Sequence, residues 1–412
     1  MDVKHIERIA AIFFLLFLAS PAFVFALYEL PVNLPSWISG EDGMYLTGSR
    51  PGKELRENLS LQDFYSENLQ AAVDEATSDF LPCKAMAQVG YTSLQRASIK
   101  LAGAPFGYEV IPAFYGSKHI IDLQRGIISA YPSNGQQPLE QMEASCREIE
   151  ALAEHHPSLN WILCLVEHRG ISRFNPGNDL VSTRNTYEDM LAVERRALSR
   201  VHVVDARAST AETVAEDNFH ADHHFQVQGA VKIYNIVIGA LGRRQVEILG
   251  YRAIEGAPEY GTYARTALCL DYPDKLYDID YQRSDISVAI DGAAVDWADV
   301  YPGCREEAPP LENRFEAIYG YAFHYDKKLI EFVNHDLPES TGALLLISDS
   351  FDNSVDRLFA ESYHSVYEID VRFNTPDEID RFLDEHEDIQ DVVIFAGEGG
   401  IKDCFVAGDG DD

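Results

Sequence analysis

The hydrophobic and polar positions of this chain alternate in blocks that predict strands and helices in turn. Four short apolar runs have the length of strands buried on both faces, at 160–167, 201–205, 344–347 and 391–395. Stretches with apolar residues at helical spacing lie among them, at 146–155, 187–199, 227–241 and 355–363. This alternation favours an α/β fold of three layers, with a parallel sheet between two layers of helices.

The alternation of strand and helix is broken between residues 246 and 312. This segment contains runs such as Ile286–Ile290, followed by Asp291-Gly292, a dipeptide that suits a tight hairpin turn. It therefore predicts a β-rich insertion. Beyond it, Thr375–Glu378 predicts a helix start with a capping box. The predicted parts are a targeting segment, the two parts of the α/β domain, the insertion between them and an acidic tail: 1–27, 28–245, 313–405, 246–312 and 406–412.

Asp349-Ser350-Phe351 stands close behind the aliphatic run Leu344–Ile347. A stretch with helical spacing follows, so we expect Ser350 in the turn between the carboxyl end of a strand and a helix. Backbone N–H groups in such a turn can stabilise an oxyanion, as in a nucleophile elbow, although the local sequence is not G-x-S-x-G. Taken alone, the motif also fits an ordinary turn, because Ser and Asp favour turns.

Asp222-His223-His224-Phe225 offers the acid and the base that a nucleophilic serine requires. Asp222 and His224 are two positions apart, so both can point to one side of an extended loop. The carboxylate then fixes the imidazole tautomer, while the far ring nitrogen faces a serine from another segment. A metal site is one alternative, since His220 adds a further ligand type, although one cluster rarely supplies a full shell. A structural or surface role is the other.

Several segments resemble the DHHW family, which is similar to the SGNH hydrolases and the alginate O-acetylation proteins. They are Asp222–Phe225 with Gly229-Ala230, 347–351, 368–372, 40–46 and 115–117. The resemblance covers most of residues 28–400 and implies a three-layer αβα SGNH-hydrolase-like fold. The Asp-His element precedes the serine, which corresponds to a circularly permuted arrangement. Triads are defined by geometry and not by chain order, so the permutation is compatible with catalysis.

By this resemblance Ser350 is the nucleophile, His224 the base and Asp222 its orienting partner, with His223 outside the triad. The implied reaction is acyl transfer, with acetyl as the acyl group and a cell-surface polysaccharide as substrate, beside a membrane-bound O-acyltransferase. No cofactor or metal is implied. Water or a sugar hydroxyl can resolve the same acyl-serine, so esterase and transferase stay open. Two other hypotheses are a non-catalytic glycan-binding or assembly protein on a degenerate SGNH fold and a metal-dependent hydrolase.

The oxyanion donors are less well defined. Backbone amides near Ser350, including that of Phe351, are candidates. The wider superfamily also uses an asparagine, for which Asn175, Asn353 and Asn334 are the candidates. Buried asparagines more often satisfy loop backbone than bind a substrate.

The charge of the chain argues against two classes of partner. Among its 412 residues, 33 are basic and 67 acidic, which gives a net charge of −34. Such a field repels nucleic acid and anionic membrane surfaces.

The first 27 residues predict export. Lys4 and Arg8 precede an apolar run, Ile9–Phe25, that is broken only by Ser20-Pro21. Val24-Phe25-Ala26 could serve as a signal-peptide cleavage site, but the run is nearly long enough to span a bilayer. The segment is thus a signal peptide or an N-terminal membrane anchor, and the protein is exported in either case.

Six cysteines in an exported chain permit disulfides. Cys269 and Cys304 bracket a stretch rich in Tyr and Asp and are the predicted pair. Cys164 lies within an apolar strand, which favours a buried thiol. No CxxC pair is present, so a thiolate zinc site has little support.

Overall fold

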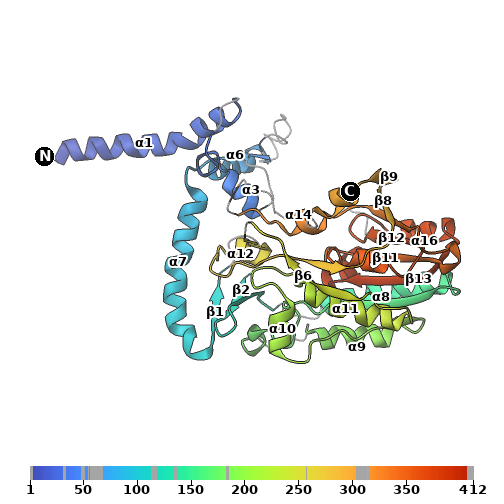
Figure 1. The fold of residues 1–412 in the computed structure, drawn as a ribbon. Helices are drawn as coiled ribbons and strands as arrows, with labels where there is room; N and C mark the ends of the chain where they lie inside the picture. Colours follow the sequence, from blue (N-terminus) through green and yellow to red (C-terminus); the bar gives the residue numbers. More distant parts are fainter. Residues whose placement is uncertain are drawn as a thin grey trace. The chain divides into compact units, whose positions relative to one another are not determined.

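The chain forms two compact units in the computed structural model, whose elements are drawn in Figure 1. The smaller, which we call the N-terminal unit, comprises Met1–Lys118, Ala264–Asp271 and Leu311–Glu316. The larger, the α/β unit, comprises His119–Tyr263, Tyr272–Pro310 and Ala317–Asp412. The structure describes residues 3–30, 34–47, 52–53, 55, 68–112, 118–132, 137–181, 185–256, 258–302, 313 and 315–405.

An eight-stranded sheet forms the centre of the α/β unit, in the order β5-β4-β13-β11-β12-β10-β8-β9. The first five of these strands run parallel. Their bounds are β4 (Asn160–Leu165), β5 (Val201–Val203), β11 (Ala343–Ser348), β12 (Ser365–Asp370) and β13 (Ile389–Ala396). β11 lies between β12 and β13, and all six of its residues are buried, as its aliphatic run predicted.

Helices cover both faces of this sheet, because the side chains of each strand alternate between two cores. Leu344 and Leu346 of β11 pack in the core that contains α11 and α15, whereas Leu345 and Ile347 pack in the opposite core. The predicted three-layer α/β fold is therefore confirmed. The helices are α11 (Val227–Ala240) and α15 (Asp356–Phe359) on one face, and α8 (Gln137–His155), α9 (Tyr187–Ala197), α16 (Pro376–Glu385) and α17 (Glu398–Cys404) on the other.

The start of α16 follows the predicted capping box. The Thr375 hydroxyl accepts a hydrogen bond from the N–H of Glu378, whose carboxylate accepts one from the N–H of Thr375. Pro376 occupies the first helical position, where its missing N–H costs no hydrogen bond.

Part of the predicted β-rich insertion extends the main sheet. β8 (Ile286–Ile290) pairs antiparallel with β10 (Leu329–Asn334) and with β9 (Ala293–Val295). Asp291 and Gly292 turn the chain between β8 and β9 with positive φ angles of 49° and 77°, as a tight hairpin requires. β6 (Ile248–Ala253) and β7 (Tyr277–Tyr281) form a two-stranded antiparallel sheet.

Short elements complete the α/β unit. β2 and β3 form an antiparallel hairpin. Their bounds and those of the remaining elements are β2 (His119–Asp122), β3 (Ile127–Ala130), η2 (Pro176–Asp179), α10 (Ala211–Asp217), α13 (Trp297–Val300), α14 (Tyr319–Phe323) and η4 (Glu339–Thr341). The division between the two units falls within α12 (Thr262–Thr266).

The N-terminal unit is mainly helical. We predicted that the α/β domain begins at residue 28, whereas the α/β unit begins at His119. Most of the described residues in 36–47 and 68–106 form helices instead, which pack around small clusters, one of which contains Leu46, Ala85 and Leu268. The elements are α1 (Val3–Tyr28), α2 (Ser36–Ser39), α3 (Glu41–Thr47), α6 (Asn68–Asp79), α7 (Lys84–Gly103), η1 (Ala104–Phe106) and β1 (Tyr108–Ile111).

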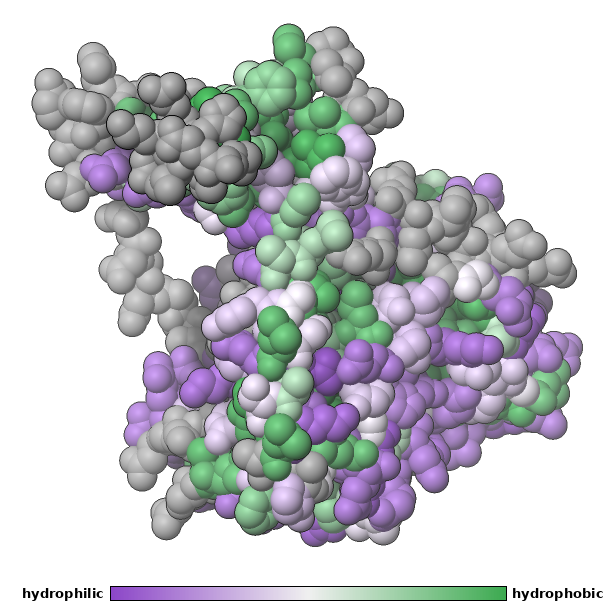
Figure 2. All heavy atoms as spheres, turned by 90° about the vertical axis from the view of Figure 1, so that its left-hand side faces the viewer, coloured by the Kyte–Doolittle hydropathy of each residue, from purple (hydrophilic) through white to green (hydrophobic). Residues whose placement is uncertain are grey.

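Apolar side chains are exposed on two helices of this unit. In α1, Ile9–Tyr28 has a mean hydropathy of 2.5 and is long and apolar enough to cross a membrane. Among the described residues it is the one helix with these properties. α7 also exposes Tyr91, Leu94 and Leu101. Figure 2 shows hydrophobic residues on the face that includes α7.

One buried acid of the α/β unit should make the free energy of unfolding depend on pH. Glu194 in α9 is fully buried, and neither carboxyl oxygen has a hydrogen-bond partner. Burial raises its pKa from 4.5 to about 8. The folded protein thus holds a proton that the unfolded chain releases, so between pH 4.5 and 8 the free energy of unfolding falls as the pH rises.

We expect Glu194→Gln to remove this decline in the free energy of unfolding, which is about 4 kcal/mol between pH 4.5 and pH 8. The measurement is urea denaturation of both proteins at pH 5 and pH 8.5. The variant should gain stability relative to wild type at the higher pH. Equal changes in the two proteins would contradict a protonated Glu194.

Candidate active site

Ser350 lies just beyond the carboxyl end of β11, in the turn that leads to α15. Asp349 holds this turn, because its carboxylate accepts hydrogen bonds from the N–H of Phe351 at 3.1 Å and of Gly397 at 2.9 Å. Burial raises the pKa of Asp349 to about 6. The helix after the turn has only four residues, shorter than the spacing predicted, because the chain must turn back to begin β12 at Ser365.

The Asp-His segment forms a closed loop before α11. An antiparallel bridge joins Asn218 to Phe225, and the N–H of Gln226 donates to the carbonyl of Asp217 at 2.8 Å. Gly229 is needed at the next turn, since a Cβ there would lie 2.2 Å from the Asp217 oxygen. The loop therefore has a defined shape although it has no regular structure.

The structure brings these two segments together. His224 Nε2 lies 2.8 Å from the Ser350 hydroxyl, although the residues are 126 positions apart. His224 Nδ1 lies 2.5 Å from Asp222 Oδ1. Asp222 is 3% exposed and His224 7%, so the acid and the base are largely shielded from water, whereas Ser350 is only half-buried. This row of acid, base and hydroxyl has the connectivity that a serine nucleophile requires.

Asp222 is held in the charged form. Burial alone would raise its pKa, but the His223 and His224 imidazoles and the hydrogen bonds from His224 hold that pKa well below 3.8. Its second oxygen accepts a hydrogen bond from the N–H of Thr262. The carboxylate can therefore stabilise a positive charge on the imidazole of His224.

Gly261 allows this contact, and sequence reasoning missed it. A Cβ at this position would lie 2.1 Å from both Cβ and Oδ2 of Asp222. We expect Gly261→Ala to displace the carboxylate and to lower kcat/KM by about 100-fold, because displacements near 1 Å have effects of this size. Gly250→Ala is the control, since Gly250 has no atom within 4 Å of an added Cβ. Wild-type kcat/KM for Gly261→Ala in an ester hydrolysis assay would contradict the role of Asp222.

Arg169 holds the main chain of the same loop. Its guanidinium, on a residue only 1% exposed, donates to the carbonyl of His220 at 3.1 Å and to that of Asp222. Burial lowers its pKa to about 10, so it stays charged at neutral pH. Asp274 accepts hydrogen bonds from the N–H groups of His220 and Ala221 at 2.9 and 2.8 Å. No local sequence signal pointed to either residue.

Tyr319 supports the histidine from α14. Its ring stacks on that of His224 with centroids 4.1 Å apart and an interplanar angle of 9°. Its hydroxyl donates to the carbonyl of Ser350 at 3.2 Å. One side chain thus orients both the base and the nucleophile loop. An isolated tyrosine carried no signal of this role.

His223 lies beside the hydrogen-bonded set of Asp222, His224 and Ser350 and is not part of it. Its Nδ1 is 3.3 Å from Asp222 Oδ1, and its ring lies 3.8 Å from that of His224. Burial, together with the neighbouring His224, lowers its pKa to about 3, so it is neutral at ordinary pH. Asp222, His223 and His224 have ligand atoms close enough for a metal ion. The side chains of Asp222 and His224 already hydrogen-bond to each other, so a metal ion bound here would compete with that hydrogen bond.

The predicted oxyanion candidates are engaged elsewhere. The N–H of Phe351 donates to Asp349, and its ring packs on His168, His224 and Phe225. The amide of Asn175 donates to the carbonyls of Ala130, Arg169 and Gly170. Asn353 donates to the carbonyl of His324 at 3.3 Å and Asn334 to that of Ala360 at 2.9 Å. The three asparagine side chains thus donate to backbone carbonyls of loops.

Of the predicted disulfide, the structure describes one partner. Cys269 is a buried free thiol, and burial raises its pKa to about 11. This does not support the bond predicted to Cys304, which lies outside the described residues. Cys164 is a fully buried thiol, as its position in an apolar strand indicated.

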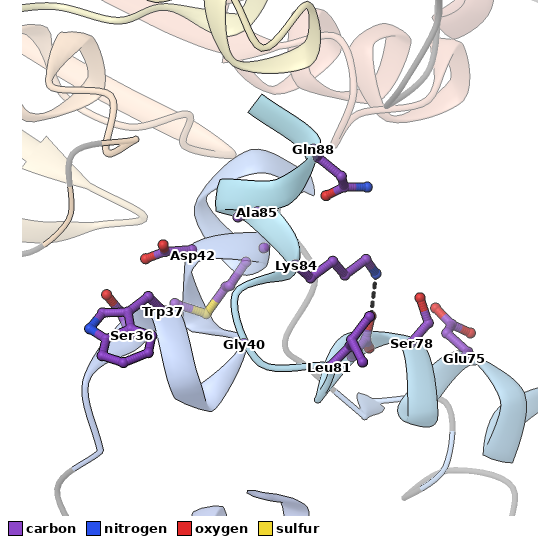
Figure 3. Close-up of a pocket in the computed structure, with 13 residues that line it drawn as sticks. Ser36, Trp37, Gly40, Asp42, Glu75, Ser78, Leu81, Lys84, Ala85 and Gln88 are labelled. Carbon is purple, nitrogen blue, oxygen red and sulfur yellow. Dashed lines mark ion pairs between the residues drawn. The ribbon is translucent and has the colours of Figure 1, made fainter. Parts of the chain in front are cut away.

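The N-terminal unit contains a pocket of about 300 Å³ between α2, α3, α6 and α7 (Figure 3). Lys84 and Asp79 form an ion pair of 3.5 Å at its wall. The described residues that line it include no histidine or cysteine, so they offer no imidazole base for an activated serine.

Comparisons with known proteins identify the fold. No protein-family model and no curated protein matches the sequence. A DHHW family protein from Eubacterium siraeum is 16% identical, with a TM-score of 0.52 over 73% of this chain and 97% of that chain. Bacillus cereus PatB1, solved with a sulfonyl adduct, is 15% identical, with a TM-score of 0.54 over 71% and 96%. The O-acetyltransferase domain of Pseudomonas putida AlgJ is 12% identical, with a TM-score of 0.39 over 71% and 92%. The chain therefore has the fold of the DHHW family protein and of PatB1.

Proposed function

We propose that this protein is a serine-dependent acyl esterase or O-acetyltransferase that acts outside the cytoplasm on a cell-surface glycan. The row of Ser350, His224 and Asp222 carries the proposal, with distances of 2.8 Å and 2.5 Å between successive members. This row supplies a nucleophile, a general base and a group that orients the base.

The geometry supports a two-step reaction. Ser350 Oγ attacks the carbonyl carbon of an acyl ester as its proton passes to His224 Nε2. The charged Asp222 stabilises the imidazolium, and the tetrahedral intermediate collapses to acyl-Ser350 as the leaving alcohol takes the proton from His224. Water or a sugar hydroxyl then gives a proton to His224 and attacks the acyl-serine, which regenerates the serine. With water the enzyme is an esterase, and with a sugar it is a transferase.

The acyl group and substrate rest on the resemblance to the DHHW family. It favours acetyl as the acyl group and a polysaccharide as the acceptor or substrate. It also implies that a membrane-bound O-acyltransferase works beside this protein. The fold shared with a DHHW family protein and PatB1 is consistent with this resemblance.

The N-terminal helix supports a location outside the cytoplasm. Ile9–Tyr28 is long and apolar enough to span a bilayer. Lys4 and Arg8 on its N-terminal side would keep that end in the cytoplasm, which directs the rest of the chain to the other side.

A sulfonyl fluoride probe tests the nucleophile directly, and the sulfonyl adduct of PatB1 makes this chemistry suitable. The full chain, solubilised in detergent, is treated with the probe and analysed by peptide mass spectrometry. We expect one adduct, on Ser350, that is absent after heat denaturation. Labelling of no serine, together with retained binding of polysaccharide, would favour the non-catalytic glycan-binding alternative.

Acetate release and acetyl transfer separate the two enzymatic alternatives. The same preparation is incubated with an acetylated polysaccharide, and separately with p-nitrophenyl acetate and unacetylated polysaccharide. Free acetate as the main product supports an esterase, and acetylated sugar supports a transferase.

A further inference from the structure

Directly behind the nucleophile turn lies a group of buried carboxylates that the proposed reaction does not use. Asp352 and Asp356 follow Ser350 in the chain and are 0% exposed. Glu368, on β12, is 6% exposed, and His324, at the end of α14, is 5% exposed. His324, Asp356 and Glu368 each offer a ligand atom, and these atoms all lie within 4.8 Å of one another.

Among the described residues, no arginine or lysine forms an ion pair with Asp352, Asp356 or Glu368. Three of their carboxylate oxygens lack a hydrogen bond of acceptable geometry: both oxygens of Asp352 and Oε2 of Glu368. Two arginines close in the chain to these carboxylates form ion pairs with other residues, Arg357 with Asp278 and Arg372 with Asp326 and Asp370. Buried carboxylates without partners are rare, and a bound cation is one of the ways in which they are compensated.

His324 is oriented as a metal ligand. Its Nδ1 lies 3.1 Å from the carbonyl of Tyr325, a contact in which the ring donates. The lone pair of a neutral ring is then on Nε2, which points at Asp356 Oδ2 at a distance of 2.9 Å. A carbonyl that fixes the tautomer in this way is common behind metal-bound histidines. His324 also has a φ of 70°, which is uncommon for a residue other than glycine.

The Asp356 carboxylate keeps acceptor capacity beyond its hydrogen bonds, since each carboxylate oxygen has two lone pairs. Its Oδ2 accepts a hydrogen bond from the Tyr301 hydroxyl at 2.6 Å, and its Oδ1 accepts one from the N–H of Arg357. With His324 and Glu368 close by, this carboxylate belongs to a buried acidic group that a cation would compensate.

We propose that His324, Asp356 and Glu368, with Asp352 beside them, bind one divalent transition-metal ion of the zinc or manganese type. An imidazole nitrogen among carboxylates favours these ions over Ca²⁺ and Mg²⁺, which take oxygen ligands. All four side chains are buried, so the ion holds structure and does not contact substrate. It would fix the Ser350 turn, because the amide of Asn353 in this turn donates to the carbonyl of His324.

The test is metal analysis of the intact chain in detergent. The protein is stripped with a chelator, dialysed against Zn²⁺, Mn²⁺, Ca²⁺ or Mg²⁺, and analysed by plasma mass spectrometry and thermal unfolding. A His155→Gln/His156→Gln background removes an exposed cluster with Asp380 that could also bind metal. We expect one Zn²⁺ or Mn²⁺ per chain and a Tm higher by about 3 °C at 100-fold excess over Kd.

Glu368→Gln and His324→Gln should each weaken this binding by more than about 100-fold, since even the loss of a group behind a ligand costs 10- to 100-fold. Glu194→Gln is the matched control: Glu194 is equally buried and lacks hydrogen-bond partners, but belongs to no group of ligand side chains within the described residues. It should bind the ion as wild type does. Stripped wild-type protein that takes up no ion and shows no Tm shift would overturn the proposal, whether or not the variants fold. Undiminished binding by Glu368→Gln would also overturn it.

Discussion

Replacing Ser350 or His224 by alanine is expected to lower kcat for ester hydrolysis by about 10⁴-fold or more, because each removes a group that reacts in the transition state. The two hydrogen-bond at 2.8 Å and act as a unit. The double variant should therefore be no less active than either single variant. The measurement is steady-state hydrolysis of p-nitrophenyl acetate by the full chain in detergent.

Ser365→Ala is the matched control for this experiment. Ser365 is a buried serine that begins β12 and pairs in register with Ala343, at the opposite end of the strands from Ser350. It should keep wild-type kcat. Losses that multiply in the double variant would show that the two side chains act independently and would contradict a nucleophile–base pair. Full activity of Ser350→Ala would remove Ser350 from the reaction.

Asp222→Asn is expected to lower kcat by about 10³- to 10⁴-fold while the fold is retained. An amide cannot carry the charge that stabilises the imidazolium, and its NH₂ replaces one of the two oxygens, so either the His224 ring or the N–H of Thr262 loses its acceptor. His223→Gln is the comparison, since His223 touches the same carboxylate but not Ser350. It should keep most of the activity.

The same variant should change the dependence of stability on pH. The pKa of Asp222 in the folded protein lies well below its ordinary value of 3.8. The stabilisation is thus fully present above pH 3.8 and is lost as the pH falls toward the folded pKa. Wild type should be more stable than Asp222→Asn at pH 7, and the two should converge below pH 3.8. A constant difference in the free energy of unfolding from pH 7 to pH 2.5 would contradict this shift.

Local sequence determined the individual elements well. The aliphatic run before Ser350 became the buried strand β11, because a strand covered on both faces needs no polar positions. Thr375–Glu378 formed the predicted capping box, and Asp291-Gly292 the predicted hairpin turn, since both depend on residues adjacent in the chain. The two-residue spacing of Asp222 and His224 likewise sufficed for their contact.

Tertiary structure decided everything that joins distant segments. It brought His224 to Ser350, and it supplied Arg169, Thr262 and Tyr319 from three other places in the chain. Each of these groups acts through burial and orientation, which depend on neighbours that no local pattern specifies. The same holds for the boundaries: β8 joined the main sheet because β10 offered it an edge to pair with, and an edge exists only once the sheet has formed.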